Sequence, residues 1–228
     1  MQKNMAYCAH HLAGDERSGE RMGFFNLCKQ LANRERLNLL RKVMSTPLRE
    51  GLTVANLADM SWLKPATARL HLHILEDECG LVESVHEDRY VTYRTRRNVQ
   101  DPDLQRLVLA LVKFFREEGH GGCDVNGLKA PDPAFAKHLP ALSDENCVRV
   151  LFEIRKEGSI SRTELLLSCG SPEPELRRHL QVLAKAGLVV EDGDSISFVE
   201  PADSLSQLFV SISFGWLQTG DVPPSAEP

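Results

Sequence analysis

Side chains that could ligate a metal or act in catalysis are sparse in this chain. Cysteines and histidines lie close together near the N-terminus and again near the middle, at spacings that are not diagnostic of a metal site. We recognise no nucleophile beside a base, no phosphate-binding loop and no carboxylate pair, so we expect neither an enzyme nor a cofactor. Whether a metal binds to the following residues stays open: Cys8, His10, His11, His120 and Cys123.

Positively charged side chains could instead bind a ligand, because Lys and Arg bind phosphates. The 228 residues carry a net charge of −5, which by itself argues against nucleic acid. The charge is unevenly placed, however: residues 1–120 hold 18 Lys and Arg against 16 Asp and Glu, and residues 121–228 hold 9 against 16. Since a nucleic-acid protein needs positive charge only where the phosphates lie, we expect the two halves to face different partners.

Apolar residues recur at regular offsets, which indicates an internal repeat. The offset is 111 residues in the first two helices and falls in steps to 101 in the last one, and each change falls at an expected turn. The two halves are therefore expected to fold alike. Matching pairs include Phe24 with Phe135, Leu37 with Val148, His71 with His179, Leu81 with Leu188, and Leu107 with Leu208.

Each half is expected to form helices, a β-hairpin and a last helix. In the first half Thr53 is a good N-cap for a short helix, residues 61–64 form a turn, and Pro65 suits the first position of the next helix. The β-prone runs 81–85 and 90–94 flank a charged tip and predict the hairpin. This order is that of a helix-turn-helix followed by a hairpin.

The last helix of the first half, over 101–118, has an apolar stripe too wide for one small domain to cover. We expect a homodimer, in which the first and last helices of this half meet those of a second copy. The alternative is an internal pseudo-dimer, in which the matching helix of the second half covers the stripe. The expected dimerisation residues are Leu104, Leu107, Val108, Leu111 and Phe115, and the alternative partner residues are Leu205, Leu208, Phe209, Ile212 and Trp216.

Several segments resemble the ArsR-type winged helix-turn-helix regulators of bacteria. LANRERLNLL at 31–40 is similar to that family's helix junction, and DRYVTYR at 88–94 is similar to its wing strand. HLHIL at 71–75 with GLV at 80–82 is similar to its second helix and following strand, and RHLQVLAKAGLV at 178–189 repeats that segment. The resemblance implies a mainly α fold of the α+β winged-helix class, with two tandem winged helix-turn-helix domains.

Together with the composition of the connecting segments, the resemblance divides the chain into four parts. A stretch rich in Gly and Pro separates the halves, and a stretch without periodicity follows the second. We expect an N-terminal DNA-binding domain at 1–119, a linker at 120–131, an acidic C-terminal domain for assembly or signal input at 132–219, and a disordered tail at 220–228.

The resemblance also implies which residues would contact DNA. In that family the start of the second helix enters the major groove, where an Arg can bind guanine with two hydrogen bonds, and Arg69 is the expected base reader. Basic residues on and after the wing would bind phosphates. Plain solvated surface is the alternative for these residues, and His71 favours a packed position at the edge of the core. The expected DNA-binding residues are Lys64, Ala66, Thr67, Arg69, Leu70, His73, Arg89, Arg94 and Arg96.

The second half carries acidic residues at the matching positions. They stand where phosphates would approach, so protein contact is the favoured role, although a Glu that accepts from cytosine keeps a DNA role open. The acidic residues are Glu173 and Glu175 on the helix and Glu191, Asp192 and Asp194 on the wing.

The sequence thus predicts a DNA-binding transcriptional regulator that reads a pseudo-palindromic operator through its first half. The alternative is a winged-helix adaptor that binds proteins and not DNA. The expected partners are double-stranded DNA and a second copy, with a protein or small-molecule effector as a further candidate. The longest apolar run, 107–112, is too short to cross a bilayer, and six cysteines without a dense framework predict reduced thiols in the cytoplasm.

Overall fold

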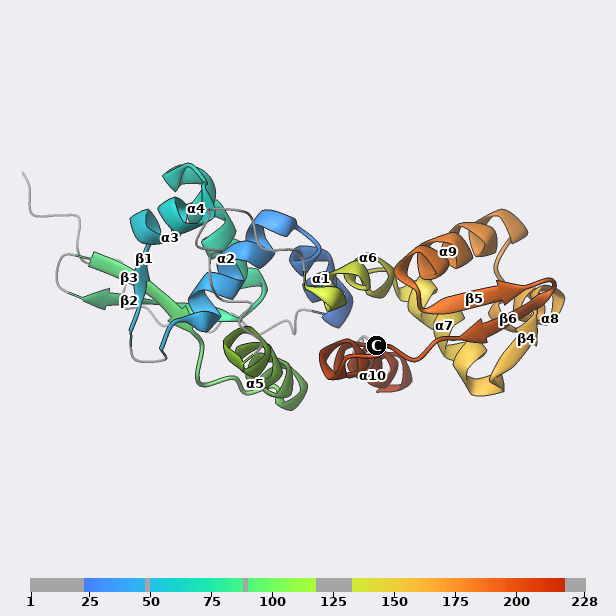
Figure 1. Cartoon of the computed structure of the whole chain (residues 1–228). Helices are drawn as coiled ribbons and strands as arrows, with labels where there is room; N and C mark the ends of the chain where they lie inside the picture. The colour runs from blue at the N-terminus through green and yellow to red at the C-terminus, as the bar shows by residue number, and fades with distance from the viewer. Residues whose placement is uncertain (1–22, 48–49, 88–89, 118–132, 220–228) are drawn as a thin grey trace, which may run out of the picture.

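The computed structural model describes residues 23–47, 50–87, 90–117 and 133–219, which fold mainly as helices with two small antiparallel sheets (Figure 1). The mainly helical class with small antiparallel sheets is confirmed. None of the helices in these residues is both long and apolar enough to span a bilayer. The expected linker at 120–131 and tail at 220–228 lie outside the described residues.

The elements fall into two successions. The first is α1 (Phe24–Leu31), α2 (Arg34–Ser45), β1 (Leu52–Thr53), α3 (Val54–Ser61), α4 (Pro65–His73), the π-helical turn η1 (Ile74–Glu78), β2 (Val82–Glu87), β3 (Tyr90–Thr95) and α5 (Pro102–Glu117). The second is the 3-10 turn η2 (Ala134–Lys137), α6 (Leu139–Leu142), α7 (Glu145–Glu157), β4 (Ser159–Ser161), α8 (Arg162–Cys169), α9 (Glu173–Ala186), β5 (Val189–Asp192), β6 (Ser195–Phe198) and α10 (Ser204–Thr219).

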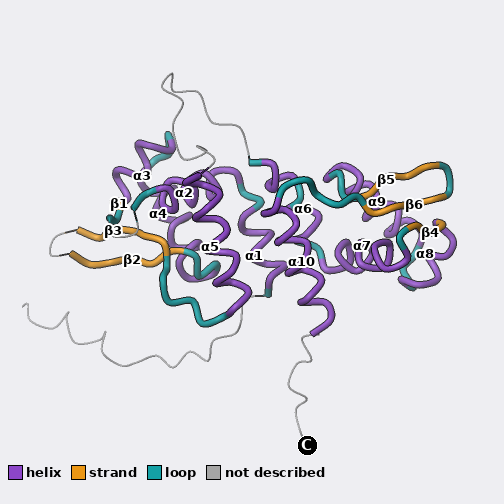
Figure 2. The backbone as a smooth tube through the Cα atoms, turned by 60° about the horizontal axis from the view of Figure 1, so that its bottom comes forward, coloured by secondary structure: helices purple, strands orange, loops and turns teal. Residues whose placement is uncertain are grey.

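Each succession forms its own three-stranded sheet, and the two sheets have the same topology. The strand orders are β1-β3-β2 and β4-β6-β5, and all neighbouring strands are antiparallel. The order of elements from α2 to α5 therefore recurs from α7 to α10, in agreement with the repeat in the sequence. The hairpins β2–β3 and β5–β6 lie at opposite ends of the molecule in both views (Figures 1 and 2).

Side-chain caps fix the starts of several helices. The hydroxyl of Thr53 accepts a hydrogen bond from the backbone N–H of Asn56 at 3.2 Å, so Thr53 caps α3 as expected. Ser161 caps α8 in the matching place, and Glu164 completes a capping box there. Asp144 caps α7 through Oδ1, which accepts from the backbone N–H of Asn146 at 2.9 Å. Local sequence thus sets the same helix boundaries in both halves.

The two halves differ in the segment between the helix α4 or α9 and the hairpin that follows it. Counted from the matching histidines, His71 and His179, the first half has one more residue than the second before the glycine that follows, Gly80 or Gly187. The extra residue is absorbed by the π-helical turn Ile74–Glu78, in which the N–H of Cys79 donates to the carbonyl of Ile74 at 2.9 Å. In the second half α9 stays α-helical up to Ala186.

A cluster of phenylalanine rings joins the two halves. The rings of Phe135 and Phe209 stack with their centroids 5.4 Å apart, and Phe24 lies 6.0 Å from Phe209. Phe114 and Phe115 of α5 contact Phe135 from the first half, at 5.6 and 6.3 Å. All five rings are buried, and the buried apolar residues form one continuous core through both halves.

This junction covers the stripe that the sequence assigns to a homodimer. Helices α1, α5, α6 and α10 lie together between the two hairpins (Figure 1), and α10 packs on both α5 and α1. The arrangement seen is thus the internal pairing, and the homodimer through this surface is not supported because the side chains that would form it are covered within one chain. Leu107, Val108, Leu111 and Phe115 are buried, and Leu104 is half-buried.

Candidate nucleic-acid interface

The helix α4 presents the expected base-reading residues on its outer face. It begins at Pro65 after Lys64, and its inner face is fixed by Ala68 and Leu72, which are fully buried. Residues three, four and seven apart share a helix face, so the outer residues form one strip. Lys64, Ala66, Arg69, Leu70 and His73 are exposed, and Thr67 is half-buried.

The start of α4 is positively charged. No acidic residue occurs in Pro65–His73, and no side chain caps the helix at Lys64. The first backbone N–H groups of a helix carry partial positive charge, and Lys64 adds a full one. This end of the helix therefore suits an anion such as a phosphate.

One residue of the hairpin β2–β3, Tyr93, lies near Arg69 of α4. Burial and the Glu76 carboxylate raise the pKa of Tyr93 on β3, and the positive charge of Arg69 opposes that rise. Arg69 on α4 thus lies within electrostatic reach of this strand.

The arginines of the hairpin have partners within the chain. Nε of Arg94 donates to Oε1 of Glu83 on the facing strand at 2.7 Å. Arg96 donates to the carbonyls of Val82 at 3.3 Å and Glu76 at 3.1 Å, and so ties the hairpin to the π-helical turn. Both side chains are half-buried, so they stiffen the hairpin in this structure. Arg89, at the expected tip, lies outside the described residues.

The two histidines of α4 have different surroundings. His71 is buried, and its Nε2 lies 3.1 Å from Oε2 of Glu35 on α2, which agrees with a packed position at the edge of the core. His73 is exposed, and its Nδ1 lies 2.5 Å from Oδ2 of Asp77 in the π-helical turn. Only His73 is placed to reach a ligand.

Large apolar side chains are exposed on and beside the same surface, and the sequence analysis singled out only one of them, Leu70. Trp62 is 75% exposed at the end of α3, where it adopts a left-handed backbone conformation with a φ of 57°. Leu70 on α4 and Tyr90 on β3 are also mostly exposed. A large aromatic residue within a predicted turn is a signal that could have identified Trp62, since such turns are mainly polar.

The matching surface of the second half is acidic. Glu173 and Glu175 occupy the first turn of α9, and Glu173 pairs with Arg177 at 3.2 Å. On its hairpin, Glu191 pairs with Arg162 of α8 at 2.5 Å, and Asp192 and Asp194 are exposed. The carboxylates at the start of α9 neutralise the positive end of that helix. An anion is therefore less attracted to α9 than to α4.

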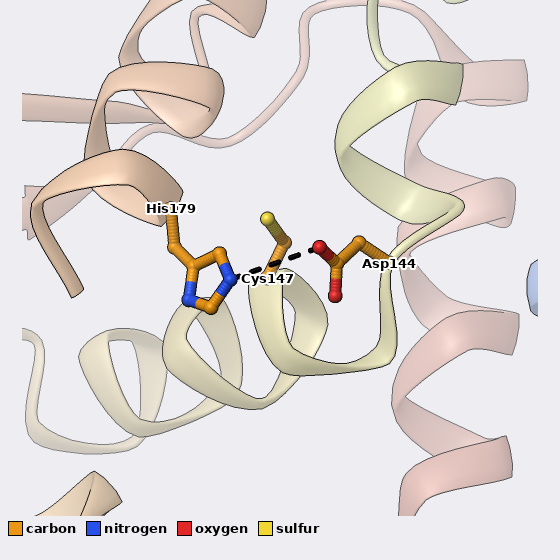
Figure 3. A group of neighbouring side chains, drawn as sticks. All are labelled: Asp144, Cys147 and His179. Atoms are coloured by element: carbon orange, nitrogen blue, oxygen red, sulfur yellow. Dashed lines mark ion pairs between the residues drawn. The ribbon is translucent and has the colours of Figure 1, made fainter. Parts of the chain in front are cut away.

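The candidate metal ligands from the sequence, Cys8, His10, His11, His120 and Cys123, lie outside the described residues. The structure instead brings together Asp144 and Cys147 of the α7 start with His179 of α9 (Figure 3). The sequence analysis missed this group because His179 lies 32 positions after Cys147 in the sequence.

Most of the cysteines that the structure describes are buried thiols. Burial raises the pKa of Cys28 and raises the pKa of Cys79 to about 12. Burial, followed by the Asp144 carboxylate, raises the pKa of Cys147 to about 12. Thiols of this kind stay protonated near neutral pH and react slowly with oxidants.

Comparison of the chain with models of protein families, with curated proteins and with solved structures finds no match in any of the three.

Proposed function

We propose that this chain is a cytoplasmic DNA-binding transcriptional regulator made of two tandem winged helix-turn-helix domains. The first domain contacts duplex DNA, with α4 in the major groove and the hairpin β2–β3 along the backbone. The second domain serves assembly or signal input. The observation that carries the proposal is the outer strip of α4, which is exposed, basic at its start and without a carboxylate.

Each residue type on this strip has a use at a DNA groove. Lys64 and the first N–H groups of α4 would hold a phosphate and so set the register of the helix on the duplex. Arg69, one turn further on, would read a guanine edge, and Thr67 or Leu70 would meet a thymine methyl group. This division of roles matches the docking of helix-turn-helix domains, in which the N-terminal residues of the second helix contact bases.

The arginines of the hairpin take a secondary role in this proposal. Arg94 and Arg96 stabilise the hairpin through Glu83 and the π-helical turn, and they add positive charge beside the backbone. They would contact phosphates only after giving up part of these interactions. Base preference is therefore assigned to α4 rather than to the hairpin.

The internal pairing changes the expected operator. A pseudo-palindrome requires two reading helices about one helical turn apart, ~34 Å, and a homodimer would supply them. Because α10 covers the stripe on α5, one chain has one basic reading helix and the expected footprint is one half-site per chain. A pseudo-palindrome then requires two chains that meet through another surface.

A selection from random duplex DNA with the full chain tests the proposal. We expect enrichment of one short sequence, and binding to it should weaken as salt rises, because each phosphate contact releases counterions. A selection without enrichment, together with the absence of salt-sensitive binding, would refute it.

The second candidate is a winged-helix adaptor that binds protein through the same end of the molecule. Trp62, Leu70 and Tyr90 favour it, since exposed aromatic and aliphatic residues are typical of protein contacts. Replacing Trp62 by Ser separates the candidates: it should leave DNA affinity within a few-fold under the main proposal, whereas under the adaptor it should abolish capture of the partner protein.

A further inference from the structure

Three side chains from α7 and α9 converge in the second half. Oδ1 of Asp144 caps α7, and its other oxygen, Oδ2, lies 3.7 Å from Nε2 of His179 on α9 (Figure 3). Cys147, three residues after Asp144, presents its Sγ to the same space. One ligand atom from each residue lies within 4.8 Å of the other two.

Cys147 and His179 are the buried members of this group. His179 is 1% exposed, and its Nδ1 has no hydrogen-bond partner among the described residues. Its Nε2 faces Asp144 at a distance too long for a good hydrogen bond. The unpartnered nitrogen is not the one that faces Asp144, and Nδ1 of His71 in the first half also has no hydrogen-bond partner among the described residues.

The first half provides a comparison at equivalent positions. His71 corresponds to His179 and also faces a carboxylate, that of Glu35 near the start of α2, at 3.1 Å, although the position equivalent to Asp144 is Asn33. In place of Cys147, however, the first half has Arg36, whose guanidinium donates to the carbonyl of Gln30 at 2.8 Å. The first half thus has an arginine at the position where the second half has a thiol.

We propose that Asp144, Cys147 and His179 form a zinc site, with the fourth position open to water or an external ligand. Zn²⁺ prefers four ligands drawn from Cys sulfur, His nitrogen and carboxylate oxygen, and tetrahedral geometry places such atoms roughly 3.3–3.7 Å apart. The measured separation of Oδ2 and Nε2 agrees with that spacing. When the metal binds, the Cys147 thiol releases its proton to solvent and its sulfur binds the ion.

One cation already lies at the mouth of this site. Nη2 of Arg178 is 3.0 Å from Nε2 of His179 and 3.9 Å from Oδ2 of Asp144. The side chain of Arg178 is 66% exposed, so its guanidinium can turn into solvent when a metal enters. Arg178 is therefore a competitor of the metal. Bound zinc would hold α9 to the start of α7, whether or not α4 binds DNA.

Cobalt(II), which takes the same ligands, is the probe for the test. We expect the full chain to bind one equivalent with the visible bands of tetrahedral cobalt and a near-ultraviolet thiolate-to-cobalt charge-transfer band. The Cys147→Ser variant should lose the charge-transfer band, and its affinity should fall at least ~10-fold. The matched control Cys169→Ser, at another described thiol, should keep both the band and the affinity.

Two further variants keep the proposal falsifiable if Cys147→Ser destabilises the fold. Asp144→Asn, which can still cap α7, should weaken cobalt binding at least ~10-fold with the charge-transfer band retained, and Arg178→Gln should tighten it. The proposal is overturned if cobalt does not bind below about 1 mM. It is equally overturned if Cys147→Ser keeps the band, which would place the sulfur elsewhere, or if Asp144→Asn and Arg178→Gln leave the affinity unchanged.

Discussion

The two halves of this chain place a helix after a short turn in the same way, yet the starts of those helices have opposite charge. The first turn of α4 has Lys64 before it and no carboxylate within it, whereas the first turn of α9 contains Glu173 and Glu175. The buried faces of the two helices are alike. The comparison teaches that a fold repeat can be conserved through its apolar positions while a few first-turn residues change what the surface attracts.

The halves are nevertheless one folding unit at their junction. Phe135 of the second half stacks on Phe209 and contacts both Phe114 and Phe115 of the first half. We therefore expect changes in this cluster to affect both halves, whereas changes on α4 or α9 should affect one function each.

The largest expected effect is on stability. Phe135→Ala removes the ring at the centre of the junction, and it should lower the free energy of unfolding by about 3–5 kcal/mol. Urea denaturation followed by circular dichroism measures this loss. Leu109→Ala, at a side chain of α5 that is 63% exposed, is the control and should change it by at most about 0.5 kcal/mol. A loss below about 1 kcal/mol for Phe135→Ala would show that the halves are not coupled through this ring.

Charge reversal on α9 should make the second half resemble the first. The double variant Glu173→Lys and Glu175→Lys should bind non-specific duplex more tightly, and the slope of log affinity against log salt should steepen by up to about 2. Glu157→Lys with Glu200→Lys makes the same change in net charge away from α9. If both double variants steepen the slope equally, the position of the charge on α9 is irrelevant.

A buried histidine at the junction should make stability depend on pH. Burial, followed by Lys137, lowers the pKa of His138 from 6.5, against a smaller opposing effect of Asp203. The unfolded chain then binds more protons than the folded one, so stability is full above about pH 6.5 and is lost as the pH falls from there towards the lowered pKa.

The first half has Leu27 at the position of His138, which supplies the matched variant. His138→Leu should remove the contribution of this group, so its unfolding free energy should fall less between pH 7.5 and pH 5 than that of the unchanged chain. Equal losses in the two proteins would contradict the assignment.

The smallest expected effect concerns the hairpin. Glu83→Gln weakens the ion pair with Arg94 and should tighten binding to any duplex about 2- to 5-fold at low salt, by leaving Arg94 available to phosphates. Glu87→Gln on the same strand removes an equal charge without releasing Arg94. If Glu83→Gln and Glu87→Gln changed the affinity for duplex DNA equally, Arg94 would not have the proposed role in binding phosphates.

Much of the fold could be predicted from the sequence because it depends on local signals. Thr53 as a cap, Pro65 at the start of a helix and the alternating runs around residues 81–94 each specify structure within a few residues. The π-helical turn was not predicted, although the extra residue before Gly80 was visible. The sequence shows that this segment is one residue longer in the first half. Whether the extra residue forms a π-helical turn or a longer loop depends on the packing around it.

The pairing of helices and the zinc site depend on contacts distant in sequence. The stripe on α5 showed that a partner was needed, but its chemistry suits α10 and a second copy equally well. Likewise, Cys147 and His179 come together only once α7 and α9 pack, since no short motif contains both. The candidate interface was easier to locate because α4 is defined by its own sequence.

The central claim is that α4 reads DNA and α9 does not, and one pair of matched variants tests it most directly. Arg69 and Arg177 occupy equivalent positions on these helices, and both are exposed. At about 0.15 M salt, fluorescence anisotropy with the selected duplex should show that Arg69→Ala raises Kd about 5- to 150-fold, or ~1–3 kcal/mol. Arg177→Ala should leave Kd within about twofold. The account is contradicted if Arg177→Ala weakens binding as much as Arg69→Ala, or if Arg69→Ala has no effect.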